Sequence, residues 1–208
     1  MGKIFYLMGK SASGKDTVYR RLLEMMTELH RVIPFTTRPA RAGEAEGVEY
    51  HFVAPDRLEN LRKQGRVIES RTYRTVKGLW TYATVDDGTF DLARYSYLMI
   101  GTLESYLAVK AYFPEGSVVP VYLWIDGGER LIRAVRREQA QSHPDYREVC
   151  RRYLADEEDF SDEKLRAAGI SGRFENADLE TCLLAVRAFI REHGQAAGEP
   201  QDPGAMPG

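Results

Sequence analysis

A glycine-rich segment near the N-terminus restricts the possible folds of this chain more than any other feature. Residues 9–15 read Gly-Lys-Ser-Ala-Ser-Gly-Lys and fit the pattern G-x-x-x-x-G-K. The segment directly follows an apolar run, Ile4 to Met8, of the kind that forms a buried strand in a parallel sheet. A helix is predicted to follow, from about Lys15 to Leu29. Strand, loop and helix in this order predict a phosphate-binding loop, or P-loop.

Each residue type in this loop suits phosphate binding. Glycines let the backbone turn so that its N–H groups point at an anion, and the N-terminus of the helix adds a positive dipole end. Lys15 can bridge the β- and γ-phosphates of ATP and offset charge as the γ-group leaves. We therefore expect ATP to bind at the following residues: Gly9, Ser11, Ala12, Ser13, Gly14, Lys15, Asp16 and Thr17.

The residue after Lys15 departs from the usual pattern. Asp16 stands where Ser or Thr normally supplies a hydroxyl to Mg²⁺, and Thr17 follows it. A carboxylate beside phosphates is costly unless a cation lies between them. Asp16 is therefore either a ligand of Mg²⁺ or of its water, or a first-turn residue that favours the helix N-terminus. We predict Asp16 and Thr17 as the metal site.

Strands and helices alternate again in the second half of the chain. Residues 97–100 and 118–125 read as strands, and a helix follows each of them. This βαβα order predicts an α/β fold of the P-loop NTPase type, with a parallel sheet and helices on both faces. Between the first helix and residue 85, residues 34–48 read as loop and residues 49–84 as short strands and turns, which predicts a small insertion.

Composition argues against several other classes of protein. A chain of 208 residues suits one α/β domain with small insertions. Its formal net charge is −2, so the surface as a whole is not marked for nucleic acid or an anionic membrane. The apolar run at the N-terminus is too short for a signal peptide or a membrane span. Cys150 and Cys182 form no metal-type spacing or disulfide framework, so a reducing cytoplasm is the expected location.

A second motif lies in the predicted insertion. Residues 36–44 read T-T-R-x-x-R-x-G-E, and residues 47–52 read G-x-x-Y-x-F. Arg38, Arg41 and Tyr50 suit a phosphate monoester, because arginine makes bidentate, always-charged contacts and tyrosine adds a hydroxyl donor. Taken alone, two arginines in a loop are more often solvated surface residues.

Together with the P-loop, these patterns resemble guanylate kinase, a P-loop nucleoside-monophosphate kinase, from about residue 3 to residue 192. The resemblance implies that ATP, with Mg²⁺, phosphorylates GMP to GDP. It implies that Arg38, Arg41 and Tyr50 bind the GMP phosphate. Tyr82 and Thr84 match a Y-G-[ST] turn that also binds this phosphate, with alanine in place of the glycine.

The same resemblance implies that Glu69 reads the guanine. A carboxylate accepts from both N1–H and N2–H of guanine, which adenine cannot offer. The alternative for Glu69 is a solvated strand end.

The C-terminal half resembles the family more loosely. Residues 131–137 and 147–152 resemble its arginine-bearing lid, which closes over ATP. Phe174 to Leu179 resembles a turn whose asparagine, here Asn176, touches the adenine ring. The alternative for the lid arginines is a charged, solvated face. The catalytic residues that the resemblance implies are Lys15, Arg38, Arg133, Arg137 (or Arg136) and Arg152.

The predicted organisation is a core with two inserted pieces and a tail. The tail is rich in Gly, Ala and Pro and is expected to be disordered. The bounds are 1–33 (core with the P-loop), 34–84 (GMP-binding insertion), 85–135 (core), 136–166 (lid), 167–194 (core) and 195–208 (tail).

Three departures from the family bear on the acceptor. Pro34 replaces a serine that touches the guanine, and Ile100 and Thr102 replace two strand aspartates. An added stretch, Arg71 to Lys77, is predicted to lengthen the loop before the Y-A-T turn. These changes keep two alternatives open: a kinase for another small phosphate such as ribose 1,5-bisphosphate, and a non-catalytic binding module. We expect a monomer or a homodimer that binds GMP and ATP, without nucleic acid or membrane.

Overall fold

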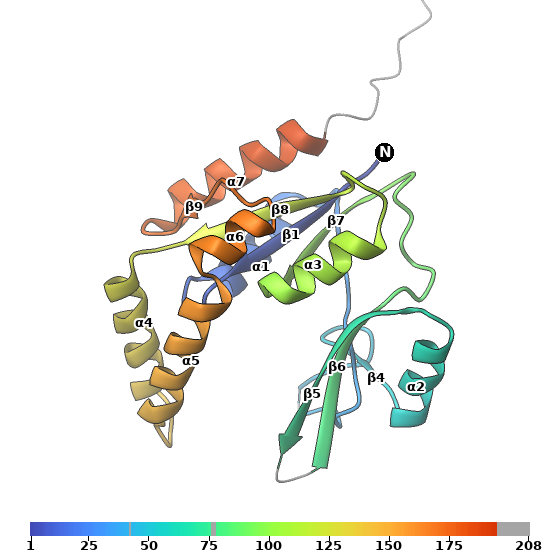
Figure 1. Cartoon of the computed structure of the whole chain (residues 1–208), viewed down its shortest axis with the longest axis horizontal. Helices are drawn as coiled ribbons and strands as arrows, with labels where there is room; N and C mark the ends of the chain where they lie inside the picture. Colours follow the sequence, from blue (N-terminus) through green and yellow to red (C-terminus); the bar gives the residue numbers. More distant parts are fainter. Residues whose placement is uncertain (42, 76–77, 195–208) are drawn as a thin grey trace, which may run out of the picture.

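A five-stranded parallel sheet forms the core of the computed structural model, which describes residues 1–41, 43–75 and 78–194 (Figure 1). The strand order is β2-β7-β1-β8-β9, and every neighbouring pair is parallel. The strands are β1 (Ile4–Gly9), β2 (Leu29–Arg31), β7 (Ser96–Gly101), β8 (Val118–Trp124) and β9 (Phe174–Glu175). The predicted α/β class is therefore confirmed.

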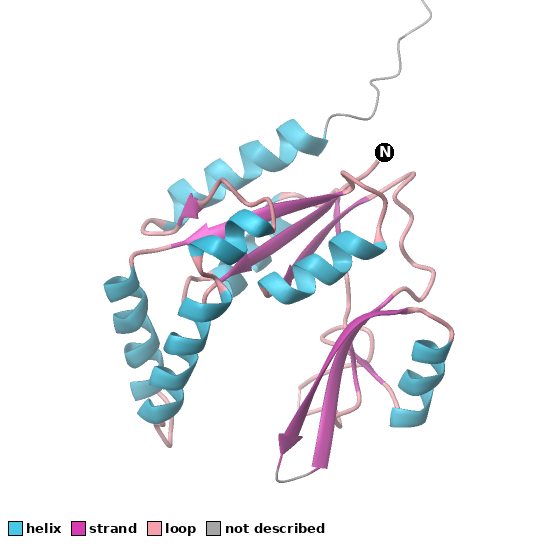
Figure 2. Ribbon diagram, viewed as in Figure 1, coloured by secondary structure: helices cyan, strands magenta, loops and turns pink. Residues whose placement is uncertain are grey.

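Helices cover both faces of this sheet. Successive residues of a strand point to opposite faces, so Ile4, Tyr6 and Met8 pack on one side of β1 and Phe5 and Leu7 on the other. Helices α3 (Leu103–Tyr112) and α6 (Asp162–Ala167) cover the first face, and α1 (Lys15–Met25) and α7 (Leu179–Gly194) cover the second (Figure 2). Burial on both sides explains why β1 reads as an uninterrupted apolar run.

The first helix is shorter than predicted. α1 ends at Met25, and Leu29, predicted as its last residue, begins strand β2. Leu29 pairs with Ser96 of β7 and is buried against the same cluster that the helix covers. Leu29 therefore fits the apolar spacing of the helix in the sequence, although it is part of strand β2.

A second sheet forms the insertion. Its strand order is β4-β3-β6-β5, with β3 (Phe35–Thr36) parallel to β4 (His51–Phe52) and antiparallel to β6 (Gly78–Val85). The prediction of residues 34–48 as loop is thus wrong at β3, which is too short to show a strand pattern. The reading of residues 49–84 as strands and turns is wrong at helix α2 (Pro55–Lys63). Pro55 begins this helix, as proline commonly does, and only Leu58 is buried.

The stretch Arg71 to Lys77 is not a loop up to residue 75. β5 (Val67–Thr75) continues through it as one arm of a hairpin with β6. Arg71 lies opposite Tyr82, and Tyr73 lies opposite Trp80. Aromatic and β-branched cross-strand neighbours stabilise such a ladder, so the added residues lengthen a strand. Lys77 lies outside the described residues.

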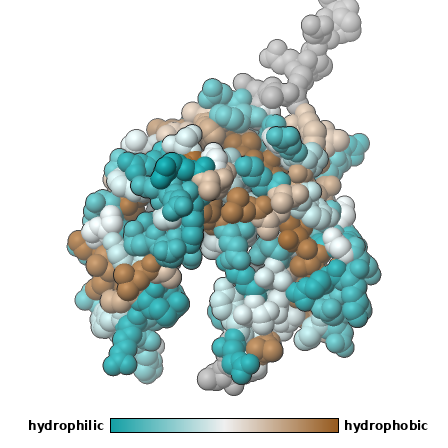
Figure 3. Space-filling model, in the orientation of Figure 1, coloured by the Kyte–Doolittle hydropathy of each residue, from teal (hydrophilic) through white to brown (hydrophobic). Residues whose placement is uncertain are grey.

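Two lobes project from the core. One is the insertion, and the other is a pair of helices, α4 (Gly127–Gln139) and α5 (Tyr146–Asp159) (Figure 1). The space-filling view shows an open cleft between the lobes (Figure 3). No helix among the described residues is long and apolar enough to cross a membrane. The predicted disordered tail, residues 195–208, lies outside the described residues.

Candidate active site

The phosphate loop joins the carboxyl end of β1 to the first turn of α1. Gly14 has φ 87° and Ala12 has φ 63°, so two residues of the loop are left-handed. Such alternation turns successive N–H groups toward one concavity, which favours an anion. A side chain at Gly14 would clash with the amide of Asn176. The Ser13 hydroxyl is buried and has no hydrogen-bond partner within the described structure, which suits a loop that binds a phosphate.

Asn176 holds the loop in this shape. Its Nδ2 donates to the carbonyl oxygen of Ser13 at 2.7 Å, and its backbone N–H donates to Trp124 at 2.8 Å. The side chain is buried between the end of β8 and the loop. The amide nitrogen of Asn176 therefore supports the phosphate loop, and the contact of this residue with adenine stays a prediction.

An ion-pair cluster fixes helices α4 and α5, the predicted lid, to the phosphate loop. Arg130 of α4 donates to Asp156 at 3.2 Å and to Glu157, both of α5. Asp156 also accepts from the backbone N–H of Ser11 at 2.8 Å, and Glu157 accepts from Lys10 at 2.7 Å. We call Lys10, Arg130, Asp156 and Glu157 the lid clasp. No sequence pattern separates Arg130, Asp156 and Glu157 from the other charged residues of α4 and α5, and Lys10 stands at a variable position of the loop pattern, so the cluster is not predictable from the sequence.

The predicted lid arginines lie in two places. Arg133 donates to the carbonyl oxygens of Asn176 at 3.1 Å and Ala177 at 3.3 Å, next to the start of α7. Arg137 and Arg152 line a small recess between α4 and α5 that also includes Ser11. Arg152 forms an ion pair with Glu148. Their catalytic roles stay predictions.

A cavity of about 550 Å³ lies between the core and the insertion. Alternate residues of a strand share a face, so one face of the β5–β6 hairpin lines it. From the hairpin come Glu69, Arg71, Tyr73, Trp80, Tyr82 and Thr84. Tyr50 and Pro34 complete the insertion side, and Tyr6, Ile100, Gly101 and Ser105 form the core side. The structure thus brings Tyr50, Glu69, Tyr82 and Thr84 to one cavity, whose described lining does not include Arg38 or Arg41, and the roles of these residues in binding stay predictions.

The cavity and the phosphate loop open at the same edge of the sheet. Met8 of β1 pairs with Gly101 of β7, so the loop that begins at Gly9 starts beside the strand end that lines the cavity. Ligands in open parallel sheets bind at the carboxyl ends of the strands. A ligand on the loop and a ligand in the cavity would therefore lie next to each other.

Glu69 is not a solvated strand end. Its side chain is 18% exposed, and it accepts a hydrogen bond from the hydroxyl of Thr84 at 2.9 Å. The Nε atom of Arg71 lies 3.8 Å from its other oxygen. Glu69 thus presents a partly buried carboxylate to the cavity.

Arg38 and Arg41 differ in their surroundings. Arg38 is 4% exposed, and its guanidinium makes a bidentate ion pair with Glu44 at 2.6 and 2.7 Å and lies over the ring of Tyr50. The hydrogen bond from Arg38, helped by the backbone N–H of Arg41, lowers the pKa of Glu44 to about 2. Arg38 is therefore no solvated surface residue, whereas Arg41 is exposed and tied to Glu44 through its backbone.

The positions of the missing aspartates hold no carboxylate. Ile100 lines the cavity, and Thr102 caps α3 while its hydroxyl accepts from Arg71 at 2.7 Å. The guanidinium of Arg71 therefore lies beside Thr102, one of the two positions where the family pattern has aspartate, and its positive charge is unfavourable for a metal there. Asp16 is exposed on the first turn of α1. Within the described ranges, no group of three or more His, Cys, Asp or Glu could hold a metal ion.

The fold and the site define a P-loop protein in which a second, smaller sheet and a pair of helices project from the core, an architecture that suits the nucleoside-monophosphate kinase class. The family model for guanylate kinase matches residues 1–85. A guanylate kinase from Mycobacterium leprae is 32% identical over 200 residues, covering 90% of this chain and 87% of that protein. The chain belongs to the guanylate kinase family, as the sequence motifs indicated.

Other similarities are more local or more remote. A guanylate kinase from Mycobacterium bovis is 45% identical over 69 residues, so this chain spans 33% of that relative's length. A guanylate kinase from Oceanobacillus iheyensis is 35% identical over 119 residues, 57% of this chain and 56% of that protein. The crystal structure of guanylate kinase from Anaplasma phagocytophilum shares the fold, with a TM-score of 0.64 and 20% identity over 93% of this chain and 87% of that one.

Proposed function

We propose that this protein transfers the γ-phosphoryl group of ATP to GMP and forms GDP. The observation that carries the proposal is the cavity of nucleotide size in which the carboxylate of Glu69 is held by Thr84, close to the aromatic rings that surround Arg38. A carboxylate in this position suits the N1–H and N2–H donors of guanine and repels a purely anionic acceptor.

The residues divide the work of phosphoryl transfer. The backbone of residues 9–15 and Lys15 would bind the phosphates of ATP, and Arg38, Arg41 and Tyr50 would bind the phosphate of GMP. An oxygen of the GMP phosphate attacks the γ-phosphorus, the bond to the β,γ-bridging oxygen breaks, and ADP leaves. Positioning and charge neutralisation carry the catalysis, so no covalent enzyme intermediate is needed.

Asp16 and Thr17 are the residues that would hold Mg²⁺. When bound, the ion neutralises charge on the ATP phosphates. Mg²⁺ keeps several waters and usually takes one or two protein carboxylates, so a single exposed carboxylate beside a hydroxyl suits it. We also place the protein in the reducing cytoplasm, which is consistent with the two free cysteines.

The function is tested by steady-state assays with GMP, AMP and ribose 1,5-bisphosphate as separate acceptors. We expect kcat/KM to be highest for GMP. Turnover of ribose 1,5-bisphosphate alone would assign a different acceptor. Saturable GMP binding without any ATP-dependent turnover would show a binding module instead of an enzyme.

Removing Arg41 is expected to weaken the acceptor site selectively. Arg41→Met should raise the KM for GMP about ten-fold, because a charge-assisted hydrogen bond contributes about 1.5–3 kcal/mol. The KM for ATP should change little. The matched control is Arg57→Met on the exposed face of α2, which should leave both constants unchanged. Equal effects of Arg41→Met on both substrates would place Arg41 outside the acceptor site.

Removing Asp16 tests its role toward Mg²⁺. Asp16→Ala should raise the Mg²⁺ concentration for half-maximal activity about ten-fold at saturating ATP and GMP, as loss of a metal-orienting group does. The control is Asp56→Ala, which removes an acidic residue from the first turn of α2. If Asp16 only favours the helix N-terminus, both variants will lose about 0.3–1 kcal/mol of stability and the Mg²⁺ dependence will not change.

A further inference from the structure

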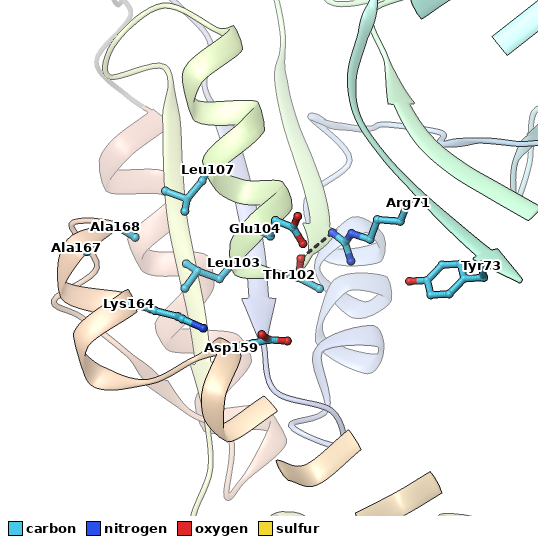
Figure 4. Close-up of a pocket in the computed structure, with 10 residues that line it drawn as sticks. All are labelled: Arg71, Tyr73, Thr102, Leu103, Glu104, Leu107, Asp159, Lys164, Ala167 and Ala168. Carbon is cyan, nitrogen blue, oxygen red and sulfur yellow. Dashed lines mark hydrogen bonds between the residues drawn. The ribbon is translucent and has the colours of Figure 1, made fainter. Parts of the chain in front are cut away.

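Arg71 lines the cavity between the core and the insertion and has no role in the phosphoryl transfer proposed above. It follows Glu69 by two residues on β5, so both side chains project from the same face of the strand. Both line the cavity of about 550 Å³. Arg71 also borders a neighbouring cavity of about 570 Å³, where it reaches toward Thr102 at the start of α3 (Figure 4).

The guanidinium of Arg71 is held in place from the core side. One of its terminal nitrogens donates to the hydroxyls of Thr102, at 2.7 Å, and Ser105. These two hydroxyls form the capping box of α3, so the arginine is anchored to a rigid helix end. The side chain remains 30% exposed. Within the described structure, its other terminal nitrogen makes no hydrogen bond and is available to a ligand.

Tyr6 and Gly101 form the core side of the cavity next to the partners of Arg71. Tyr6 reaches across from β1 to Gly101, where any side chain would clash with its hydroxyl. Burial raises the pKa of Tyr6 to about 12, although Ser105 partly offsets this effect, so the phenol stays neutral. Among the described contacts, the core groups that accept from Arg71 are the uncharged hydroxyls of Thr102 and Ser105, and the carboxylate of Glu69 lies within ion-pair distance.

A carboxylate beside a guanidinium complements one base in particular. Guanine presents two donors, N1–H and N2–H, next to two acceptors, O6 and N7. A carboxylate can accept from the donors, and one guanidinium nitrogen that carries two free N–H groups can donate to the neighbouring acceptors O6 and N7. Adenine offers a donor where guanine has O6. Ribose 1,5-bisphosphate, the alternative acceptor, has a second phosphate in place of a base, and the carboxylate of Glu69 would repel that phosphate in this cavity.

We propose that Arg71 is a specificity-determining residue whose remaining terminal nitrogen donates its two N–H groups to O6 and N7 of the guanine, while Glu69 accepts from N1–H and N2–H. This inference rests on the proposed GMP kinase activity. Arg71 takes over the O6 contact for which Pro34, on the same cavity wall, has no donor. The chain thus reads guanine with a residue from its lengthened β5 strand.

The test uses base analogues on the wild-type protein. 7-deaza-GMP lacks the N7 acceptor, and IMP lacks the N2 amino group. We expect kcat/KM to fall about ten-fold or more for 7-deaza-GMP relative to GMP, because a charged donor loses its partner. Equal use of GMP and 7-deaza-GMP by the wild-type protein would overturn the role of Arg71. Failure to form any GDP would instead overturn the proposed function on which it rests.

Variants then assign each contact to its residue. Arg71→Gln should bring the GMP to 7-deaza-GMP ratio close to one and keep the preference for GMP over IMP. Glu69→Gln should keep the preference for GMP over 7-deaza-GMP and lose the preference for GMP over IMP. Arg74→Gln changes an exposed arginine on the opposite face of the same strand and should keep both preferences. If Arg71→Gln does not fold, Arg71→Lys keeps the charge but lacks the second nitrogen that would bond the base while the first is held by Thr102 and Ser105, so it should also lose the 7-deaza discrimination. A folded Arg71 variant that keeps the wild-type ratio would refute the assignment.

Discussion

Replacing Lys15 by alanine is expected to lower kcat for GDP formation by about 10²- to 10³-fold, the usual effect of removing one group that stabilises transition-state charge. Lys15 follows the left-handed Gly14 at the start of α1. Its amine makes no ion pair or hydrogen bond within the described residues, so it is available to phosphate. Because charge develops as the γ-group leaves, its interaction should be stronger in the transition state than with bound ATP.

Steady-state kinetics at saturating ATP and GMP measure this effect. Thermal unfolding of Lys15→Ala should match that of the wild type, since a partly exposed amine without partners adds little to stability. Lys63→Ala, at the exposed end of α2, is the control for loss of a lysine and should keep full activity. A Lys15→Ala protein that is folded and nearly as active would remove the phosphate loop from the mechanism.

Replacing Arg130 by methionine is expected to cost about 3 kcal/mol of stability, as does breaking a buried ion pair on one side. Arg130 is 2% exposed and also lies 4.0 Å from the ring centre of Tyr153. Without it, Asp156 would keep only the backbone N–H of Ser11 as a partner among the contacts described here. For a domain of this size, such a loss should lower the melting temperature by about 10 °C.

Thermal or denaturant unfolding measures the change. Arg151→Met is the matched control, because Arg151 lies on the exposed side of α5 and its ion-pair partner among the described residues is Glu148. Surface pairs contribute about 0–1 kcal/mol, so this variant should differ little from the wild type. Adding Asp156→Asn to Arg130→Met should recover part of the loss, because the amide still accepts from Ser11 without a buried charge. Equal stability of Arg130→Met and Arg151→Met would show that the lid clasp does not hold α4 and α5 to the loop.

The core of the fold could be predicted from the sequence because its signals are local. The run Ile4 to Met8 is apolar without alternation, and the glycine-rich segment after it requires a turn at a strand end. The order of later strands and helices then leaves few topologies. The error at Leu29 arose because a residue that packs under a helix can belong to the next strand.

The candidate acceptor site was only partly predictable. Motif residues such as Tyr50 and Glu69 were found, and the structure brings them to one cavity. Arg71 was assigned to a loop because added residues between two family motifs usually lengthen a loop. The alternation of Glu69, Arg71 and Tyr73 on β5 is a period-2 pattern that could have placed it on the cavity face. The lid clasp could not be predicted, because residues such as Lys10 and Glu157 meet only through the tertiary fold.

Competition among acceptors in a single reaction tests the central claim most directly. The protein is incubated with γ-labelled ATP, Mg²⁺ and equal concentrations of GMP, AMP and ribose 1,5-bisphosphate, and the labelled products are separated. Competition reports the ratio of kcat/KM values and so compares the acceptors under identical conditions. The cavity with Glu69 and Arg71 predicts that the label is found almost entirely in GDP. Label in the phosphorylated ribose, or no transfer to any acceptor, would contradict the assignment of this protein as a GMP kinase.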